Sequence, residues 1–129
     1  MPIRMTIEKD NQLIKTTASG RVTGEQLIAY YRQLRSHPDF RSNLNEIFDT
    51  TQIEAIDVTA DDIHRLSSVT EQFTSRGNPV KVAIIAPADL PFGLSRMYEM
   101  LQSQSINILK VFRERPAAEA WISESSVEQ

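Results

Sequence analysis

The residues best suited to chemistry in this sequence follow an apolar, β-branched stretch over residues 80–87. Such a stretch predicts a strand buried on both faces, and the helical spacing of the apolar residues after it predicts a helix that continues to Leu101. Ligands of α/β proteins usually bind at the turn between such a strand and its helix. The residues at this turn combine an acid, a base, a glycine and two large apolar side chains: Asp89, Phe92, Gly93, Arg96 and Met97. We therefore predict a ligand or partner site at this turn.

A purely structural role for the same turn is the alternative. Asp89 would then cap the helix, Gly93 would pack against a strand, and Arg96 would pair with a nearby acid. In the functional reading, Gly93 lets a ligand or another backbone approach closely, and the helix N-terminus attracts an anion. Gly93 alone does not make a G-x-G-x-x-G fingerprint, so the turn predicts no dinucleotide, and we expect no cofactor.

Acidic residues gather in the middle of the chain, where residues 41–76 hold seven acids and three bases. The acids are Glu46, Asp49, Glu54, Asp57, Asp61, Asp62 and Glu71. Asp57, Asp61 and Asp62 could hold a hard cation such as Mg²⁺, but the spacing is not that of an EF-hand. Capping by Thr59 and compensation of the helix dipole explain the same acids, so we expect no metal.

Catalytic groups are sparse in this sequence. His37 stands at a predicted helix end, and His64 lies on a predicted solvent face. No serine lies in a nucleophile elbow, and the absence of cysteine excludes thiolate catalysis and disulfides. We therefore expect no catalytic residues and no enzymatic activity.

Length and composition indicate one globular domain. The chain has 129 residues, 40% of them hydrophobic, and we place the domain at 1–123 with a polar tail at 124–129. A net charge of −3 argues against nucleic-acid binding. The sequence shows no signal peptide and no stretch long enough to span a membrane, so we expect a cytoplasmic protein.

The pattern of apolar residues predicts nine elements in the order β-β-α-β-α-β-α-β-α. Gly20 is expected to end the second strand, and residues 50–58 are expected to form a connection. This order is typical of an α/β fold with a mostly parallel five-stranded sheet and an antiparallel N-terminal strand. The expected elements span 3–8, 13–19, 23–36, 44–49, 60–75, 80–87, 90–101, 106–112 and 116–122.

Four parts of the sequence resemble SpoIIAA-like proteins of the STAS/Sec14-related fold group: Phe48-Asp49 and the segments 82–97, 111–113 and 118–122. The resemblance implies a single-layer βα superhelix with its helices mainly on one side of the sheet. Because this fold signature comes without a catalytic set, we expect a non-catalytic binding or regulatory module, a homodimer with an unidentified protein partner. A carrier of an apolar or lipid-like small molecule is the alternative function, and a small enzyme ranks third.

The resemblance also suggests a regulatory position. STAS anti-sigma antagonists carry a phosphorylatable serine at the start of the second helix, and Asp57 and Thr59 fall in register with that motif. The glycines of the motif are missing here. Asp61 and Asp62 follow directly and would repel a phosphate on Thr59. Thr59 is therefore a candidate phospho-switch whose surroundings oppose it.

Exposed apolar surface is the last predicted feature. Ile28, Tyr31, Phe92 and Met100 lie at or beyond the edges of the predicted buried helix faces. Such surface is typical of oligomer interfaces and hydrophobic grooves, and a wide core stripe is the alternative explanation.

Overall fold

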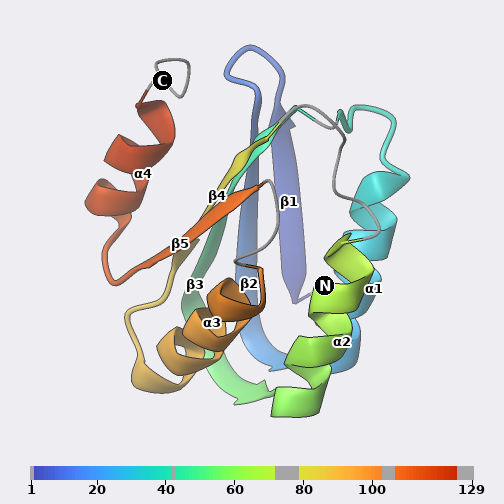
Figure 1. Ribbon diagram of the computed structural model, residues 1–129, viewed down its shortest axis with the longest axis vertical. Helices are drawn as coiled ribbons and strands as arrows, with labels where there is room; N and C mark the ends of the chain where they lie inside the picture. The colour runs from blue at the N-terminus through green and yellow to red at the C-terminus, as the bar shows by residue number, and fades with distance from the viewer. Residues whose placement is uncertain (1, 42, 72–78, 103–106, 125–129) are drawn as a thin grey trace.

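A computed structural model shows one five-stranded sheet with helices on both faces (Figure 1). It describes residues 2–41, 43–71, 79–102 and 107–124. Helices α1, α2 and α3 cover one face of the sheet, and α4 lies on the other (Figure 1). The elements are β1 (Ile3–Glu8), β2 (Leu13–Thr23), α1 (Gly24–Arg35), β3 (Asn45–Asp57), α2 (Ala60–Glu71), β4 (Lys81–Ile85), α3 (Asp89–Leu101), β5 (Ile108–Phe112) and α4 (Arg115–Ser123).

The strands lie side by side in chain order, β1-β2-β3-β4-β5. β1 is antiparallel to β2, and the other three pairs are parallel. The predicted fold class and order of elements are confirmed. Residues 72–75 of the second predicted helix and 125–129 of the predicted tail lie outside the described residues.

The sequence predicted that the second strand ends at Gly20, but the strand continues past it. Gly20 has a φ of +68°, and the pairing of β2 with β3 is irregular beside it. Glycine adopts this φ without a steric penalty, so the strand forms a bulge there and continues to Thr23. The prediction was wrong because glycine can bend a strand without terminating it.

The third strand is also longer than predicted. Residues 50–57 form strand rather than a connection, because they pair with β2 as far as Thr23↔Asp57. The pairing of β3 with β4 ends at Asp49↔Ile85. Beyond that point β3 pairs with β2 alone. Ile53 and Ile56 are partly buried there and face the helices.

The sheet supports two hydrophobic clusters. The larger lies under α1, α2 and α3 and includes Phe48, Ile84 and Tyr98. The smaller lies under α4 and includes Ile85 and Ala118. Three of the four helices thus share one face, in line with the implied arrangement, and α4 gives β3 and β4 a second buried face.

Both ends of α4 are tied to the sheet by charged side chains. At its start, Arg115 forms an ion pair with Asp49, which is buried at the end of the β3–β4 pairing. At its other end, the Lys81 ammonium donates to the carbonyl oxygens of Trp121 (2.9 Å) and Glu124 (3.0 Å). Burial raises the pKa of Asp49, but the Thr51 N–H and Arg115 outweigh burial and lower the pKa overall.

Candidate functional site

The predicted site at the start of α3 is only partly assembled. Asp89 does not cap the helix, because the N-cap is Ala88, whose side chain makes no capping bond. Asp89 instead pairs with Arg113 from the end of β5 (Nη1 to Oδ1, 3.0 Å). The Arg113 guanidinium also lies 3.8 Å from the centre of the Phe92 ring and donates to the Pro87 carbonyl. Arg113, which the sequence analysis did not select, therefore links Asp89 to Phe92.

The other predicted residues point elsewhere. Arg96 pairs with Glu99 one turn along the same helix (Nε to Oε1, 3.3 Å), as the structural alternative proposed. Met97 is half-buried against the core. No atom lies within 4 Å of the place where a Gly93 side chain would begin, so the predicted packing of Gly93 against a strand is wrong. Gly93 lies on the exposed side of α3.

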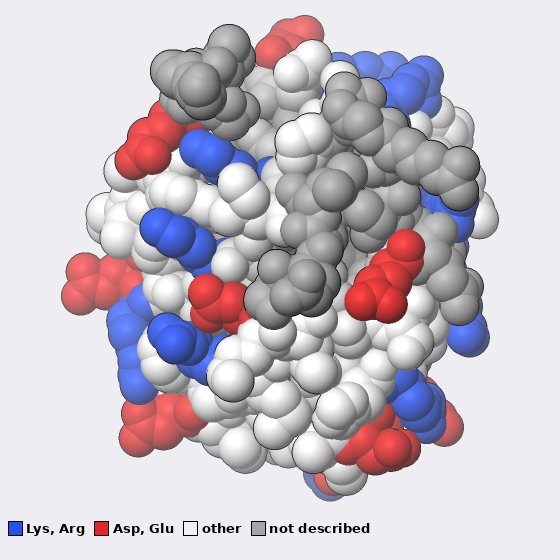
Figure 2. All heavy atoms as spheres, in the orientation of Figure 1, with Lys and Arg blue, Asp and Glu red and all other residues white. Residues whose placement is uncertain are grey.

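Helix α3 leaves much of its apolar surface uncovered. Among its residues only Pro91 and Tyr98 are buried, while Leu90 is 59% and Met100 is 71% exposed. Leu90, Gly93, Met97 and Met100 follow one another at intervals of three and four residues, so they form one stripe, the α3 stripe. Figure 2 shows a largely uncharged area in the lower middle of this face, with charged side chains on either side of it.

An apolar cavity of about 60 Å³ lies between α2, α3 and β3. Its lining includes Phe48, Ile53, Leu66 and Leu94. Small-molecule sites generally measure about 300–1,000 Å³. In this conformation the cavity is therefore too small for a lipid.

Thr59 and Asp62 cap helix α2 reciprocally. The Asp62 N–H donates to Thr59 Oγ1 and the Thr59 N–H donates to Asp62 Oδ2, both at 3.0 Å. The bond from the Thr59 N–H is the main reason that the pKa of Asp62 is lowered. Asp57 is exposed and pairs with Arg21 (Nη2 to Oδ2, 3.3 Å), so the two predicted switch residues are held by different partners. In the described ranges, no three acidic or histidine side chains converge as a metal site.

Replacement of Thr59 by alanine is expected to lower the free energy of unfolding by about 1 kcal/mol, the usual cost of losing such a cap. Thermal and urea unfolding measure this loss. A Thr59→Ser variant retains the hydroxyl and is expected to behave like the wild type. Equal losses in the two variants would contradict a capping role.

A buried polar cluster, absent from the predicted sites, lies beneath α1. Glu46 on β3 is 5% exposed and accepts hydrogen bonds from Thr16 (2.9 Å), Tyr30 (3.2 Å) and Tyr31 (3.2 Å). Burial raises the pKa of Glu46 despite these bonds, and it also raises the pKa values of Tyr30 and Tyr31. The signal in the sequence was the position of Glu46 among the apolar residues of segment 44–48. The sequence analysis had counted Glu46 only as one of the acids of residues 41–76.

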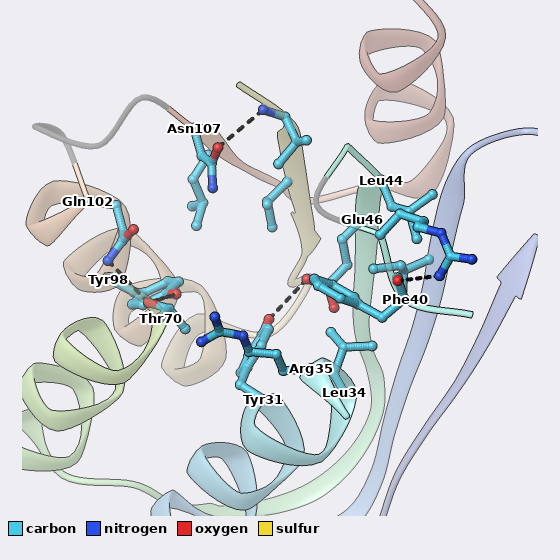
Figure 3. Close-up of a pocket in the computed structure, with 15 residues that line it drawn as sticks. Tyr31, Leu34, Arg35, Phe40, Leu44, Glu46, Thr70, Tyr98, Gln102 and Asn107 are labelled. Carbon is cyan, nitrogen blue, oxygen red and sulfur yellow. Dashed lines mark hydrogen bonds between the residues drawn. The ribbon is translucent and has the colours of Figure 1, made fainter. Parts of the chain in front are cut away.

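Glu46 borders a cavity of about 100 Å³ near the amino ends of β3 and β4 (Figure 3). Tyr31 and Arg35 enter it from α1, and Tyr98 and Gln102 from the end of α3 (Figure 3). The cavity therefore lies at the opposite end of the strands from the predicted α3 turn.

A search of family models and a search of curated proteins found no match to this chain. Among solved structures, the chain is similar to an uncharacterised protein of the DUF3478 family from Shewanella loihica PV-4, which is described as having a SpoIIAA-like fold. The two chains share 19% identity and superpose with a TM-score of 0.58 over 93% of each. This chain has a SpoIIAA-like fold. No helix in the described ranges is long and apolar enough to cross a membrane.

Proposed function

We propose that this protein is a non-catalytic binding module, and that the α3 stripe is its binding surface. The observation that carries the proposal is the 71% exposure of Met100 and the 59% exposure of Leu90 on one side of a helix. Large apolar side chains grouped on one exposed surface generally mark an interface. The proposal moves the predicted site from the turn itself to the outer side of α3.

A second copy of this chain is the occupant that the stripe fits best. Gly93 leaves a gap on the helix surface, and Met100 projects seven residues, or about two turns, further along the same side. An antiparallel pair of α3 helices would place each Met100 over the Gly93 of the other copy. A surface that is complementary to itself in this way forms a two-fold symmetric dimer.

The surroundings of the two histidines support a non-catalytic role. His37 Nδ1 accepts the Asp39 N–H at 3.0 Å, and His64 is exposed on α2. Among the described residues, neither histidine is hydrogen-bonded to a serine or threonine hydroxyl, the contact that activates such a nucleophile.

The carrier function receives less support from the geometry. The 60 Å³ cavity is apolar, as a carrier needs, but a lipid-like ligand would require α3 to move away from α2. The exposed α3 stripe needs no such movement to bind a partner. We therefore rank the binding module first.

Sedimentation velocity and native mass spectrometry test this proposal. The wild-type protein is expected to dimerise at micromolar concentrations, and Met100→Glu is expected to weaken the dimer at least tenfold. Ile108→Glu is the matched control, because Ile108 is also an exposed apolar residue (50%). Ile108 pairs with Lys81 and so lies on the face of the sheet that α4 covers, opposite α3. It should dimerise as the wild type does.

A wild-type protein that stays monomeric at high micromolar concentration would contradict the proposed dimer. Equal weakening by both substitutions would show that the α3 stripe is not the interface. A small molecule that remains bound in native mass spectra would favour the carrier instead.

A further inference from the structure

The carboxyl-terminal part of β3 has a strand beside it on one side only. β3 pairs with β4 only as far as Asp49, but it pairs with β2 as far as Asp57. In the described ranges, no backbone hydrogen bond joins residues 52–57 to any segment other than β2. Four of these six residues are exposed to solvent. Residues 52–57 are therefore an open strand edge, the β3 free edge.

The β3 free edge can accept a further strand. The edge of a strand presents backbone N–H and C=O groups that have no partner in the sheet. Six residues match the usual length of a strand, which is about five to six residues. Proline and lysine, which commonly protect such edges from pairing, do not occur in residues 52–57. An extended segment can therefore pair with β3 through backbone hydrogen bonds, the mode of recognition called β-strand addition.

The apolar cavity of about 60 Å³ borders the β3 free edge. Ile53 and Ile56 of the edge line it, together with Pro91 and Leu94 of α3. The cavity has about twice the volume of a water molecule, so it accommodates the end of one short aliphatic side chain. Side chains of a strand point alternately to the two faces of the sheet. Every second side chain of an added strand therefore lies on the face that carries the cavity.

The charges near the β3 free edge favour a basic partner. Residues 50–62 contain four acids and no lysine or arginine. Two of these acids, Asp57 and Asp62, pair with arginines from elsewhere in the chain. Glu54 and Asp61 are exposed and form no ion pair with any described residue. Opposite charges on neighbouring strands stabilise their pairing, so a lysine or arginine opposite Glu54 is preferred.

A second copy of this chain fits the β3 free edge less well. Two such edges related by a two-fold axis would run antiparallel to each other. Glu54 and Asp57 of one copy would then face the same acids of the other. Like charges that lie opposite each other on paired strands destabilise the pairing. The edge is therefore complementary to a different chain.

We propose that the β3 free edge binds an extended segment of another protein, with apolar residues at alternate positions and at least one lysine or arginine. Backbone hydrogen bonds to residues 52–57 hold the segment, one apolar side chain enters the 60 Å³ cavity, and the basic side chain pairs with Glu54. The α3 stripe lies on the exposed side of α3, whereas Pro91 and Leu94 face the core. The inference therefore adds a second surface and does not depend on the proposed dimer.

NMR titration of the isotopically labelled protein with a synthetic peptide tests the proposal. The peptide is Lys-Val-Thr-Val-Lys-Val-Thr, blocked at both ends. Amide signals of residues 52–57 are expected to shift and saturate, and their hydrogen exchange is expected to slow. One control peptide carries glutamate in place of both lysines, and another is N-methylated at every backbone nitrogen. Binding of the N-methylated peptide is expected to be about tenfold weaker or absent, because it has lost its backbone donors.

Three variants of the protein test the charge and the cavity. Glu54→Lys is expected to weaken binding of the lysine peptide about three- to fivefold and to strengthen binding of the glutamate peptide. Asp10→Lys makes the same change of charge at an exposed residue between β1 and β2, and should bind both peptides as the wild type does. Ser95→Leu fills the cavity and is expected to weaken binding about tenfold, while thermal unfolding confirms that the variant is folded.

Met100→Glu should bind the lysine peptide as the wild type does, so failure of the α3 dimer and failure of the β3 site are distinguishable. Equal binding of the lysine and glutamate peptides, equal binding of the N-methylated peptide, or saturation at another surface would each overturn the proposal. The absence of any saturable shift would also overturn it. So would shifts of residues 52–57 that depend on protein concentration alone in Met100→Glu, because they would identify a second copy as the occupant.

Discussion

A Glu46→Gln variant is expected to keep its stability at alkaline pH, where the wild-type protein loses part of its own. In the folded protein, burial raises the pKa of Glu46 above the ordinary 4.5. Between these two pKa values the folded state holds a proton that the unfolded state has lost. The free energy of unfolding therefore falls as pH rises through that window, and it is highest below pH 4.5 as far as Glu46 is concerned.

Glutamine reproduces the protonated form of Glu46 without titrating. Its amide nitrogen can donate as a protonated carboxyl group would, and its oxygen can accept from Tyr31. Urea unfolding of the two proteins should give similar stabilities near pH 5. At about pH 9 the variant is expected to be the more stable of the two, because the wild-type protein must then bury a charged carboxylate. Parallel pH profiles of the two proteins would contradict a raised pKa of Glu46.

The second large expected effect is at Gly24, the first residue of α1. A Cβ placed on Gly24 would lie 2.6 Å from Asp62 Cβ, closer than side chains tolerate. Asp62 cannot move aside freely, because its backbone and its side chain form the two capping bonds with Thr59. Gly24→Ala is therefore expected to lower the free energy of unfolding by about 1–3 kcal/mol.

Gly93→Ala is the matched control for Gly24→Ala. Both glycines lie in helices, but the Cβ of an alanine at position 93 would meet no atom within 4 Å. This substitution is expected to leave stability unchanged or to raise it by about 0.5–1 kcal/mol, because alanine favours the helix. Chemical unfolding of both variants makes the comparison, and equal effects would show that the α1–α2 contact is not tight at Gly24.

The helix caps of this fold could be predicted from local sequence. The predicted element 23–36 begins at Thr23, which the structure shows as the N-cap of α1, its side chain accepting the Gln26 N–H in a reciprocal cap. Thr59 predicted the start of α2 in the same way. Strand ends were less readable, because the pairing of residues 50–57 depends on β2, a strand more than thirty residues earlier in the chain.

The candidate sites likewise include one feature that local sequence predicted and others that it did not. The apolar surplus at Met100 was visible as a residue outside the buried helical face, and the structure leaves that residue exposed. In the sequence, Glu46 and Asp49 were two of the seven acids counted between residues 41 and 76. In the fold they are buried on opposite faces of β3, one beneath α1 and the other paired with Arg115 of α4.

The sequence by itself determined the order of the elements, the parallel character of the sheet and the positions of the helix caps, because these depend on residues close together in the chain. The tertiary structure decided which groups meet. The Glu46 cluster joins β2, α1 and β3, and its cavity also needs the end of α3. Contacts between such distant segments depend on strand register and helix packing, to which local spacing is insensitive. For that reason the α3 stripe was partly foreseen, whereas the buried acid beneath α1 was found only in the fold.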